Sequence, residues 1–111
     1  MDKIVLKSLH CTLNEEVDKD EVYLKWKGKK IWPSAMYKQM NSGEQAAINY
    51  SFETEDEIVE IELWDFDLLS SNDLLGTFIF KPGGEKGNFS TSMRMGESSG
   101  TASYFIEWSS K

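Results

Sequence analysis

The fold is decided by residues 60–76, EIELWDFDLLSSNDLLG, where a strand pattern changes into an aspartate-rich segment. Ile61 and Leu63 are apolar, and they alternate with the charged residues Glu60 and Glu62. A period of two residues is typical of a strand with one face in the core and the other in solvent. The alternation stops after Trp64, so we expect the strand to end there and a loop to begin.

Three carboxylates follow within nine residues of this loop. Asp65 and Asp67 come directly after the strand, Asp73 follows, and Gly76 closes the segment. Carboxylates held this close repel one another, which is costly unless a cation offsets their charge. The segment therefore predicts a cation site, and calcium is the first candidate because it takes hard oxygen ligands from flexible loops.

Length and charge limit the classes of protein that are possible. The 111 residues fit one domain, 1–111, and a domain cut from a longer protein would have the same composition. The formal net charge of −7 argues against nucleic-acid binding, and against anionic membranes unless a cation inverts the local charge.

A single cysteine, Cys11, excludes an internal disulfide. No transmembrane run or signal peptide is visible, so we expect a chain that is soluble or peripheral to a membrane, in a compartment that the sequence leaves open.

Eight short strands separated by turns are expected, and no long helix. Their ranges are 4–11, 21–27, 30–32, 46–52, 58–64, 74–81, 88–95 and 101–108. Gly28-Lys29 is predicted to form a two-residue hairpin turn. Residues 34–40 fit a short helical turn capped by Ser34, an irregular crossing or an edge strand. The pattern predicts an all-β fold, an eight-stranded antiparallel Greek-key β-sandwich.

An EF-hand is excluded position by position. Counting from Asp65, its fifth, sixth and twelfth positions fall on Leu69, Ser70 and Gly76. An EF-hand requires an oxygen ligand, a glycine and a bidentate glutamate at these places. The flanking segments are also predicted strands and not helices.

The same residues resemble the third calcium-binding loop of C2 domains. In that family a strand is followed by Asp-x-Asp, five residues, a further Asp and a nearby Gly, which Asp65, Asp67, Asp73 and Gly76 reproduce. Residues 20–24, DEVYL, are similar to the family segment that follows the first calcium loop. The resemblance extends from about residue 3 to residue 108.

The resemblance implies a C2-like calcium-binding sandwich with both acidic loops at one end. Because the acidic loops follow the first and the fifth expected strands, their order resembles the circularly permuted, type II arrangement. The implied calcium ligands are Asp20, Asp65, the Phe66 carbonyl, Asp67, Ser70 and Asp73, with Asn14 and Asp18 as candidates from the first loop. Asn14 stands where the family has an aspartate. We therefore expect one or two calcium ions with dissociation constants of roughly 10⁻⁶ to 10⁻³ M.

Two further groups of residues bear on membrane binding. Leu68 and Leu69 lie inside the aspartate loop, where C2 domains that bind membranes expose residues to the bilayer. They are the candidate membrane contacts, although one of them could instead pack on the end of the sandwich. Lysines 25, 27, 29 and 30 resemble the basic strand with which some C2 domains bind anionic headgroups, and an ordinary charged edge hairpin explains them at least as well.

We expect no enzyme, because no catalytic constellation can be assembled from the sequence. His10 and Cys11 are neighbours on a strand, so their side chains point to opposite faces. The leading hypothesis is a calcium-binding C2-like module that docks to an anionic phospholipid membrane, a protein partner or other domains of a host chain. The alternative is a β-sandwich that recognises a protein or a glycan, with calcium only structural or absent.

Overall fold

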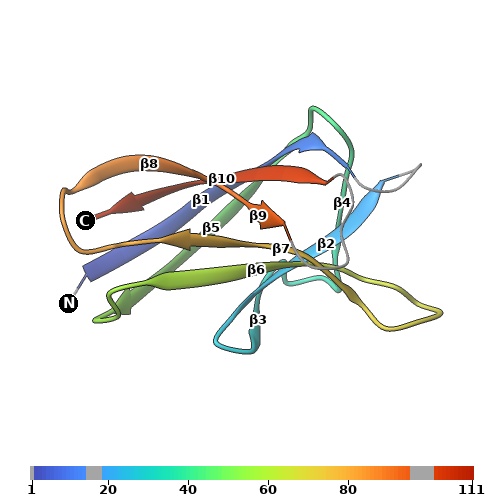
Figure 1. The fold of residues 1–111 in the computed structure, drawn as a ribbon, viewed down its shortest axis with the longest axis horizontal. Coiled ribbons are helices and arrows are strands. Elements are labelled where there is room, and N and C mark those ends of the chain that lie inside the picture. Colours follow the sequence, from blue (N-terminus) through green and yellow to red (C-terminus); the bar gives the residue numbers. More distant parts are fainter. Residues whose placement is uncertain (1, 15–18, 96–101) are drawn as a thin grey trace.

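The structure is a computed structural model that describes residues 2–14, 19–95 and 102–111, and these form two antiparallel sheets (Figure 1). The strands are β1 (Asp2–Leu13), β2 (Asp20–Trp26), β3 (Lys29–Trp32), β4 (Lys38–Met40), β5 (Gln45–Thr54), β6 (Val59–Asp65), β7 (Asp73–Phe80), β8 (Gly87–Ser92), β9 (Arg94–Met95) and β10 (Ser103–Ser110). Within these residues no helix is long and apolar enough to cross a membrane. The predicted all-β sandwich is confirmed. The described residues contain two short strands beyond the eight expected ranges, because β4 forms within residues 34–40 and the strand expected over 88–95 is divided into β8 and β9.

One sheet, which we call sheet A, has the strand order β5-β1-β10-β8. Its two central strands come from opposite ends of the chain, with Ile4 opposite Ser110 and Leu9 opposite Ile106. The first and last strands are therefore paired, and both termini lie at the same end of the molecule (Figure 1).

The second sheet, sheet B, has the order β3-β2-β6-β7-β9, and β4 also pairs with β2. Strand β6 lies in its centre, with Leu24 and Gly76 on either side of Leu63. The strand that leads into the aspartate loop is therefore central to this sheet.

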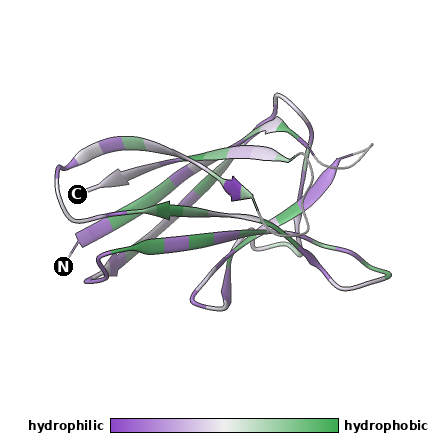
Figure 2. Ribbon diagram, in the orientation of Figure 1, coloured by the Kyte–Doolittle hydropathy of each residue, from purple (hydrophilic) through white to green (hydrophobic). Residues whose placement is uncertain are grey.

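The core lies between the sheets and follows the predicted alternation. Ile61 and Leu63 are fully buried, whereas Glu60 is exposed. On the opposing sheet Ile106 is fully buried, and Trp108 stacks on Phe80 with ring centroids 4.1 Å apart. Figure 2 shows this spacing as apolar positions that recur along the strands. Burial of these side chains supplies the main stabilising free energy, since the chain has no disulfide.

The β2–β3 turn differs from its predicted position by one residue. Its two central residues are Lys27 and Gly28, with φ values of 53° and 77°, and not Gly28 and Lys29. Two successive positive φ values match the twist of the flanking strands in a tight hairpin. Strand β2 ends at Trp26, which packs on Phe52 with ring centroids 4.1 Å apart, and Lys27 then turns the chain.

Of the alternatives for residues 34–40, the structure shows an edge strand, β4. Lys38, Gln39 and Met40 pair with the start of β2, from Asp20 to Val22, and no helical turn forms over the predicted 34–40 segment. Met40 is buried and anchors this strand to the core. A turn follows β4 at residues 42–43, with Gly43 at a φ of 86°.

The strand expected over 88–95 is divided between the sheets. Strand β8 pairs with β10 in sheet A, and β9 pairs with β7 in sheet B. Met93 lies at the crossing, where its amide donates to the Tyr104 carbonyl at 2.9 Å. Gly76 is in close contact with this crossing. A side chain at position 76 would collide with the Arg94 backbone and the Met93 side chain. Gly76 is therefore needed for close packing as well as for the end of the aspartate loop.

Candidate metal centre at the loop end of the sandwich

The aspartate loop and the first residues of β2 meet at the end of the molecule opposite the termini (Figure 1). The Phe66 amide donates to the Glu21 carbonyl at 2.7 Å, which joins the start of the aspartate loop to β2. A third segment, the β4–β5 turn, is tied to β1 because the Gly43 amide donates to the Cys11 carbonyl at 2.8 Å. The sandwich thus brings together oxygen-rich segments that are far apart in the sequence.

Asp20 and Asp65 form the buried part of this end. Each lies in line with the core residues of its strand, and their exposed fractions are 0% and 3%. Asp65 Oδ1 accepts a hydrogen bond from the Glu21 amide at 2.9 Å, so it joins the two strands at their ends. Neither carboxylate faces solvent freely.

The Asp20 carboxylate points across the core to sheet A. Its Oδ2 accepts a hydrogen bond from the Tyr104 hydroxyl at 2.6 Å. Burial, followed by this hydrogen bond, raises the pKa of Tyr104 far above its usual value, so the phenol remains a donor. Burial also raises the pKa of the Cys11 thiol, which lies opposite Tyr104 in the β1–β10 ladder. Asp20 therefore links the two sheets at the loop end.

Asp67 organises the exposed loop from within. Its Oδ2 accepts from the Ser70 hydroxyl at 2.7 Å, and its Oδ1 accepts from the Leu69 amide at 2.9 Å. These hydrogen bonds lower the pKa of Asp67 below its usual value because they stabilise the charged form. The hydrogen bond from Ser70 has the largest effect. The predicted ligands Asp67 and Ser70 are thus brought together, with Asp67 capping a turn.

Asn72, which the sequence argument did not single out, fixes the other side of the loop. Its Oδ1 accepts from the Asp67 amide at 2.9 Å, and its Nδ2 donates to the Tyr23 hydroxyl at 2.7 Å. An Asn among small polar residues is a turn signal, but its partner on β2 lies 49 residues away in the sequence. Only the tertiary structure reveals this role.

The remaining predicted ligands are distributed unevenly. Asp73 is exposed and lies directly opposite Asp65 in the β6–β7 ladder. Phe66 is half-buried and stacks on Tyr37 with centroids 5.3 Å apart. Asn14 Oδ1 accepts from the Ser42 hydroxyl at 2.7 Å. Asp18 lies outside the described residues.

No three His, Cys, Asp or Glu side chains come together as a metal-holding group within residues 2–14, 19–95 and 102–111. The donors nevertheless suit a hard cation in type, since they are carboxylate, amide, hydroxyl and main-chain oxygens. Asp65 pairs with Asp73 across the strands, and Asp67 lies two residues further along the chain.

The leucines at the tip of the loop are exposed. Leu68 and Leu69 have exposed fractions of 83% and 94%, and neither packs on the end of the sandwich. Figure 2 shows this apolar tip at the far end of the β6–β7 loop. Adjacent leucines with so much exposed surface, beside three carboxylates, form an amphipathic loop.

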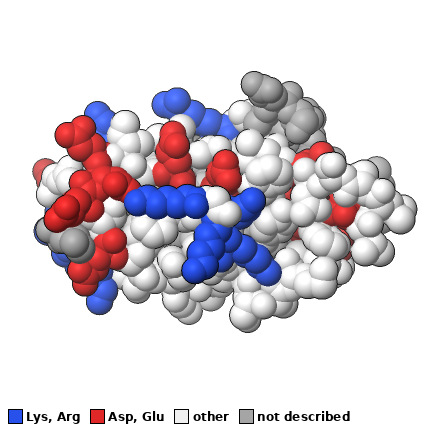
Figure 3. Space-filling view, turned by 90° about the horizontal axis from the view of Figure 1, so that it is seen from below, with Lys and Arg blue, Asp and Glu red and all other residues white. Residues whose placement is uncertain are grey.

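The basic hairpin lies on a separate part of the surface. Lys25 lies over the Trp64 ring at 5.0 Å, and Lys27 lies over the Trp26 ring at 4.9 Å and pairs with Asp56 at 2.9 Å. Figure 3 shows basic side chains gathered over the middle of one face, with acidic side chains beside them and most densely at the left end of the view. Some of these lysines are thus engaged by neighbours within the fold.

Ser8, His10 and Glu107 form a polar cluster on the outer face of sheet A. The Ser8 hydroxyl lies 2.9 Å from His10 Nε2 and donates to Glu107 Oε1 at 3.1 Å, and Glu107 Oε1 also contacts Nε2. Because the serine and the acid approach the same ring nitrogen, the cluster lacks the relay in which each holds a different one. Cys11 points into the core, as the strand alternation predicts.

Comparison with known proteins identifies the class of fold. No protein-family model matches the sequence, and no curated protein matches it significantly. A solved structure of a C2 domain from plant extended synaptotagmin 1 matches with a TM-score of 0.56 and 13% identity, over 99% of this chain and 92% of that domain. The chain therefore has a C2-like β-sandwich fold, as the aspartate spacing predicts, and the type II order stays a prediction.

Proposed function

We propose that this C2-like module binds calcium through its aspartate loop and thereby docks to an anionic phospholipid membrane. The observation that carries the proposal is the composition of one loop. Asp65 and Asp73 are cross-strand neighbours at its base, Asp67 lies between them in the sequence, and Leu68 and Leu69 form its exposed tip.

Asp65, Asp67 and Asp73 would hold the ion, with the Phe66 carbonyl and the Ser70 hydroxyl completing the loop's contribution. The Asp67 carboxylate can keep its hydrogen bonds while it ligates, because each oxygen has two lone pairs. Asp20 and Asn14 are candidate ligands from the adjacent segment, and Asp18 stays a prediction from the sequence. Bound calcium would offset the negative charge of these carboxylates.

Charge explains why docking would depend on the ion. The chain carries a net charge of −7, so an anionic surface repels it when the loop is empty. A bound divalent cation inverts the local charge and bridges to lipid headgroups. Leu68 and Leu69 would then enter the boundary of the acyl chains, where burial of apolar surface adds to the electrostatic attraction.

Thermal unfolding with added calcium tests the metal site. If the dissociation constant is 10⁻³ M or lower, about 10 mM calcium should raise Tm by about 5 °C or more, because the ion binds only the folded state. Asp67→Asn should abolish the rise, and magnesium at the same concentration is the control for ionic strength. An unchanged Tm would contradict the metal site.

Co-sedimentation with phosphatidylserine vesicles tests the docking step separately. Leu69→Ala should weaken calcium-dependent sedimentation while the calcium-induced rise in Tm remains. If calcium raised Tm but the protein never sedimented with vesicles, the metal site would be supported and the membrane-docking step would be contradicted.

A β-sandwich that recognises a protein or a glycan is the second candidate. It is favoured by the internal hydrogen bonds of the acidic residues, in which Asp20 accepts from Tyr104 and Asp67 accepts from Ser70. These bonds stabilise the loop end without an ion. A Tm that does not respond to calcium would favour this candidate.

A further inference from the structure

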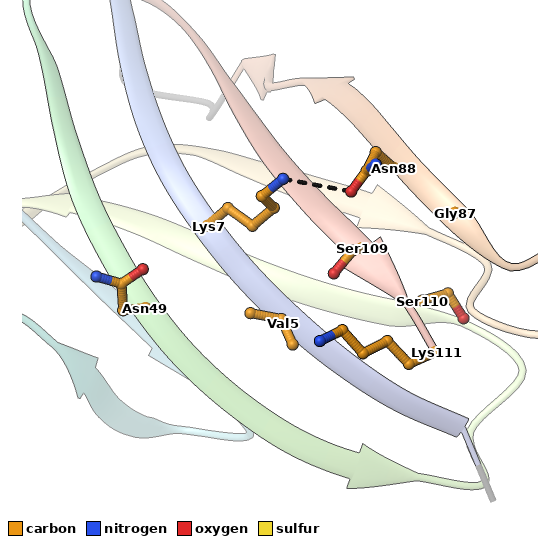
Figure 4. Close-up of a pocket in the computed structure, with 8 residues that line it drawn as sticks. All are labelled: Val5, Lys7, Asn49, Gly87, Asn88, Ser109, Ser110 and Lys111. Atoms are coloured by element: carbon orange, nitrogen blue, oxygen red, sulfur yellow. Dashed lines mark hydrogen bonds between the residues drawn. The ribbon is translucent and has the colours of Figure 1, made fainter.

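The outer face of sheet A carries an open hollow that the calcium proposal does not use (Figure 4). Its volume is about 440 Å³, within the range of small-molecule sites. Val5 and Ser109 lie on the two central strands, and Asn49 and Asn88 come from the outer strands β5 and β8. All four strands of the sheet therefore contribute to it.

The hollow is basic on a strongly acidic protein. Among the described residues that line it, Lys7 and Lys111 are charged and no Asp or Glu is present, although the chain has 19 acidic residues. Glu107, two residues before Ser109 on β10, is engaged by His10 and Ser8. Two lysine side chains with no carboxylate side chain beside them in the lining favour a small anion.

An irregularity in the sheet positions two of the lining residues. The registers of β1 with both of its neighbours shift between Leu6 and Ser8, so Lys7 lies at a β-bulge. On β5 the same shift coincides with Asn49, whose φ is 53°. Bulges re-aim side chains, and both irregular residues line the hollow.

Two polar side chains of the hollow are joined to each other, and a third residue is anchored through its backbone. The Lys7 ammonium donates to Asn88 Oδ1 at 3.3 Å, which uses one of its three protons. Lys111 is anchored through its backbone, since its amide donates to the Lys3 carbonyl and its carbonyl accepts from Lys86, both at 2.9 Å. Two ammonium groups on anchored residues, with hydroxyl and amide neighbours, suit an oxyanion.

We propose that this hollow binds the phosphate group of a small, soluble phosphate monoester. A phosphate monoester carries a charge of about −1.5 to −2 at pH 7, which matches the two lysines. Ser109, Asn49 and Asn88 supply hydroxyl and amide groups for the polar part of the ligand. Val5 is the one aliphatic residue among the described lining residues, which disfavours a lipophilic ligand.

The test is an amide NMR titration of the whole chain with glucose 6-phosphate. Shifts should concentrate at Lys7, Asn49, Asn88 and Ser109, and glucose alone should give none. Lys7→Gln and Lys111→Gln should each raise the dissociation constant about fivefold, since each removes one exposed charge-assisted contact. Lys111 is exposed at the chain end, so its variant keeps the experiment informative if Lys7→Gln misfolds.

Lys29→Gln, on the basic hairpin outside the hollow, is the matched control and should leave the affinity unchanged. Shifts centred on residues 25–30, equal effects of Lys29→Gln and Lys7→Gln, or no shifts at all would overturn the proposal. Binding to phosphatidate vesicles without any response to glucose 6-phosphate would also overturn it, because the ligand would then be a lipid.

Discussion

The two pairs of aspartates at the loop end differ in what holds them. Asp20 and Asp65 lie on strands, are buried, and accept hydrogen bonds from Tyr104 and from the Glu21 amide. Asp67 lies in the loop between β6 and β7 and is partly exposed, and Asp73 is the exposed first residue of β7. The buried pair is positioned by the sheets, whereas Asp67 is positioned by its own loop. The comparison teaches that carboxylates at one end of a sandwich can be positioned in two ways, by the strands that carry them or by hydrogen bonds within a loop.

The largest expected effect is the loss of the buried pair's hydrogen bonding. Asp20→Ala should lower the free energy of unfolding by about 2–3 kcal/mol, because it leaves the buried Tyr104 hydroxyl without this acceptor and opens a void. Asp73→Ala, on the exposed side, should change it by less than about 0.5 kcal/mol. Urea denaturation without calcium measures both.

A double-mutant cycle sharpens this assignment. Asp20→Asn and Tyr104→Phe should be less costly together than the sum of the single changes, because they remove two halves of one contact. Equal stabilities of Asp20→Ala and Asp73→Ala would contradict the distinction between the pairs.

A smaller effect is expected where the exposed loop is joined to β2. Asn72→Ala removes the acceptor of the Asp67 amide and the donor to Tyr23, so it should cost about 1 kcal/mol in urea denaturation. It should also weaken the calcium response proposed above, because Asp67 loses its support. Ser71→Ala, one residue earlier and exposed, is the matched control and should match the wild type in both measurements.

The smallest effect concerns the titration of Asp67. Ser70→Ala should raise the pKa of the Asp67 carboxyl toward its usual 3.8, because the first cause of its lowering is the Ser70 hydrogen bond. A carboxyl whose pKa is lower in the folded state contributes stability above its unfolded pKa and loses it as pH falls through the folded value. Wild type and variant should therefore differ above about pH 4 and converge in stronger acid.

Carboxyl carbon NMR during an acid titration measures this pKa directly. Ser70→Thr keeps a hydroxyl and should leave the pKa low. An unchanged pKa in Ser70→Ala would mean that the loop does not hold Asp67 as described.

The strands were predictable because their faces alternate locally. Ile61 and Leu63 of β6, and Tyr104, Ile106 and Trp108 of β10, are buried as their spacing predicts. The aspartate spacing also led to the C2-like fold, which the comparison confirms. In each case the information lies within about ten neighbouring residues.

What escaped prediction depends on contacts between distant residues. The burial of Asp20 requires Tyr104, 84 residues away, and the division of β8 from β9 depends on the crossing of Met93 over Gly76. The one-residue error in the β2–β3 turn also coincides with a distant contact, because Trp26 at the end of β2 packs on Phe52 of β5. No local pattern reports these partners.

The pairing of the first strand with the last has a mechanical consequence. Strands β1 and β10 are antiparallel, and their outer ends, near Ile4 and Ser110, lie side by side. A force that pulls the two ends of the chain apart therefore loads these interstrand hydrogen bonds one after another, as in the opening of a zipper, and not all together in shear. The ends should peel apart at low force, and the aspartate loop, at the far end of the molecule (Figure 1), should be among the last parts to feel the load.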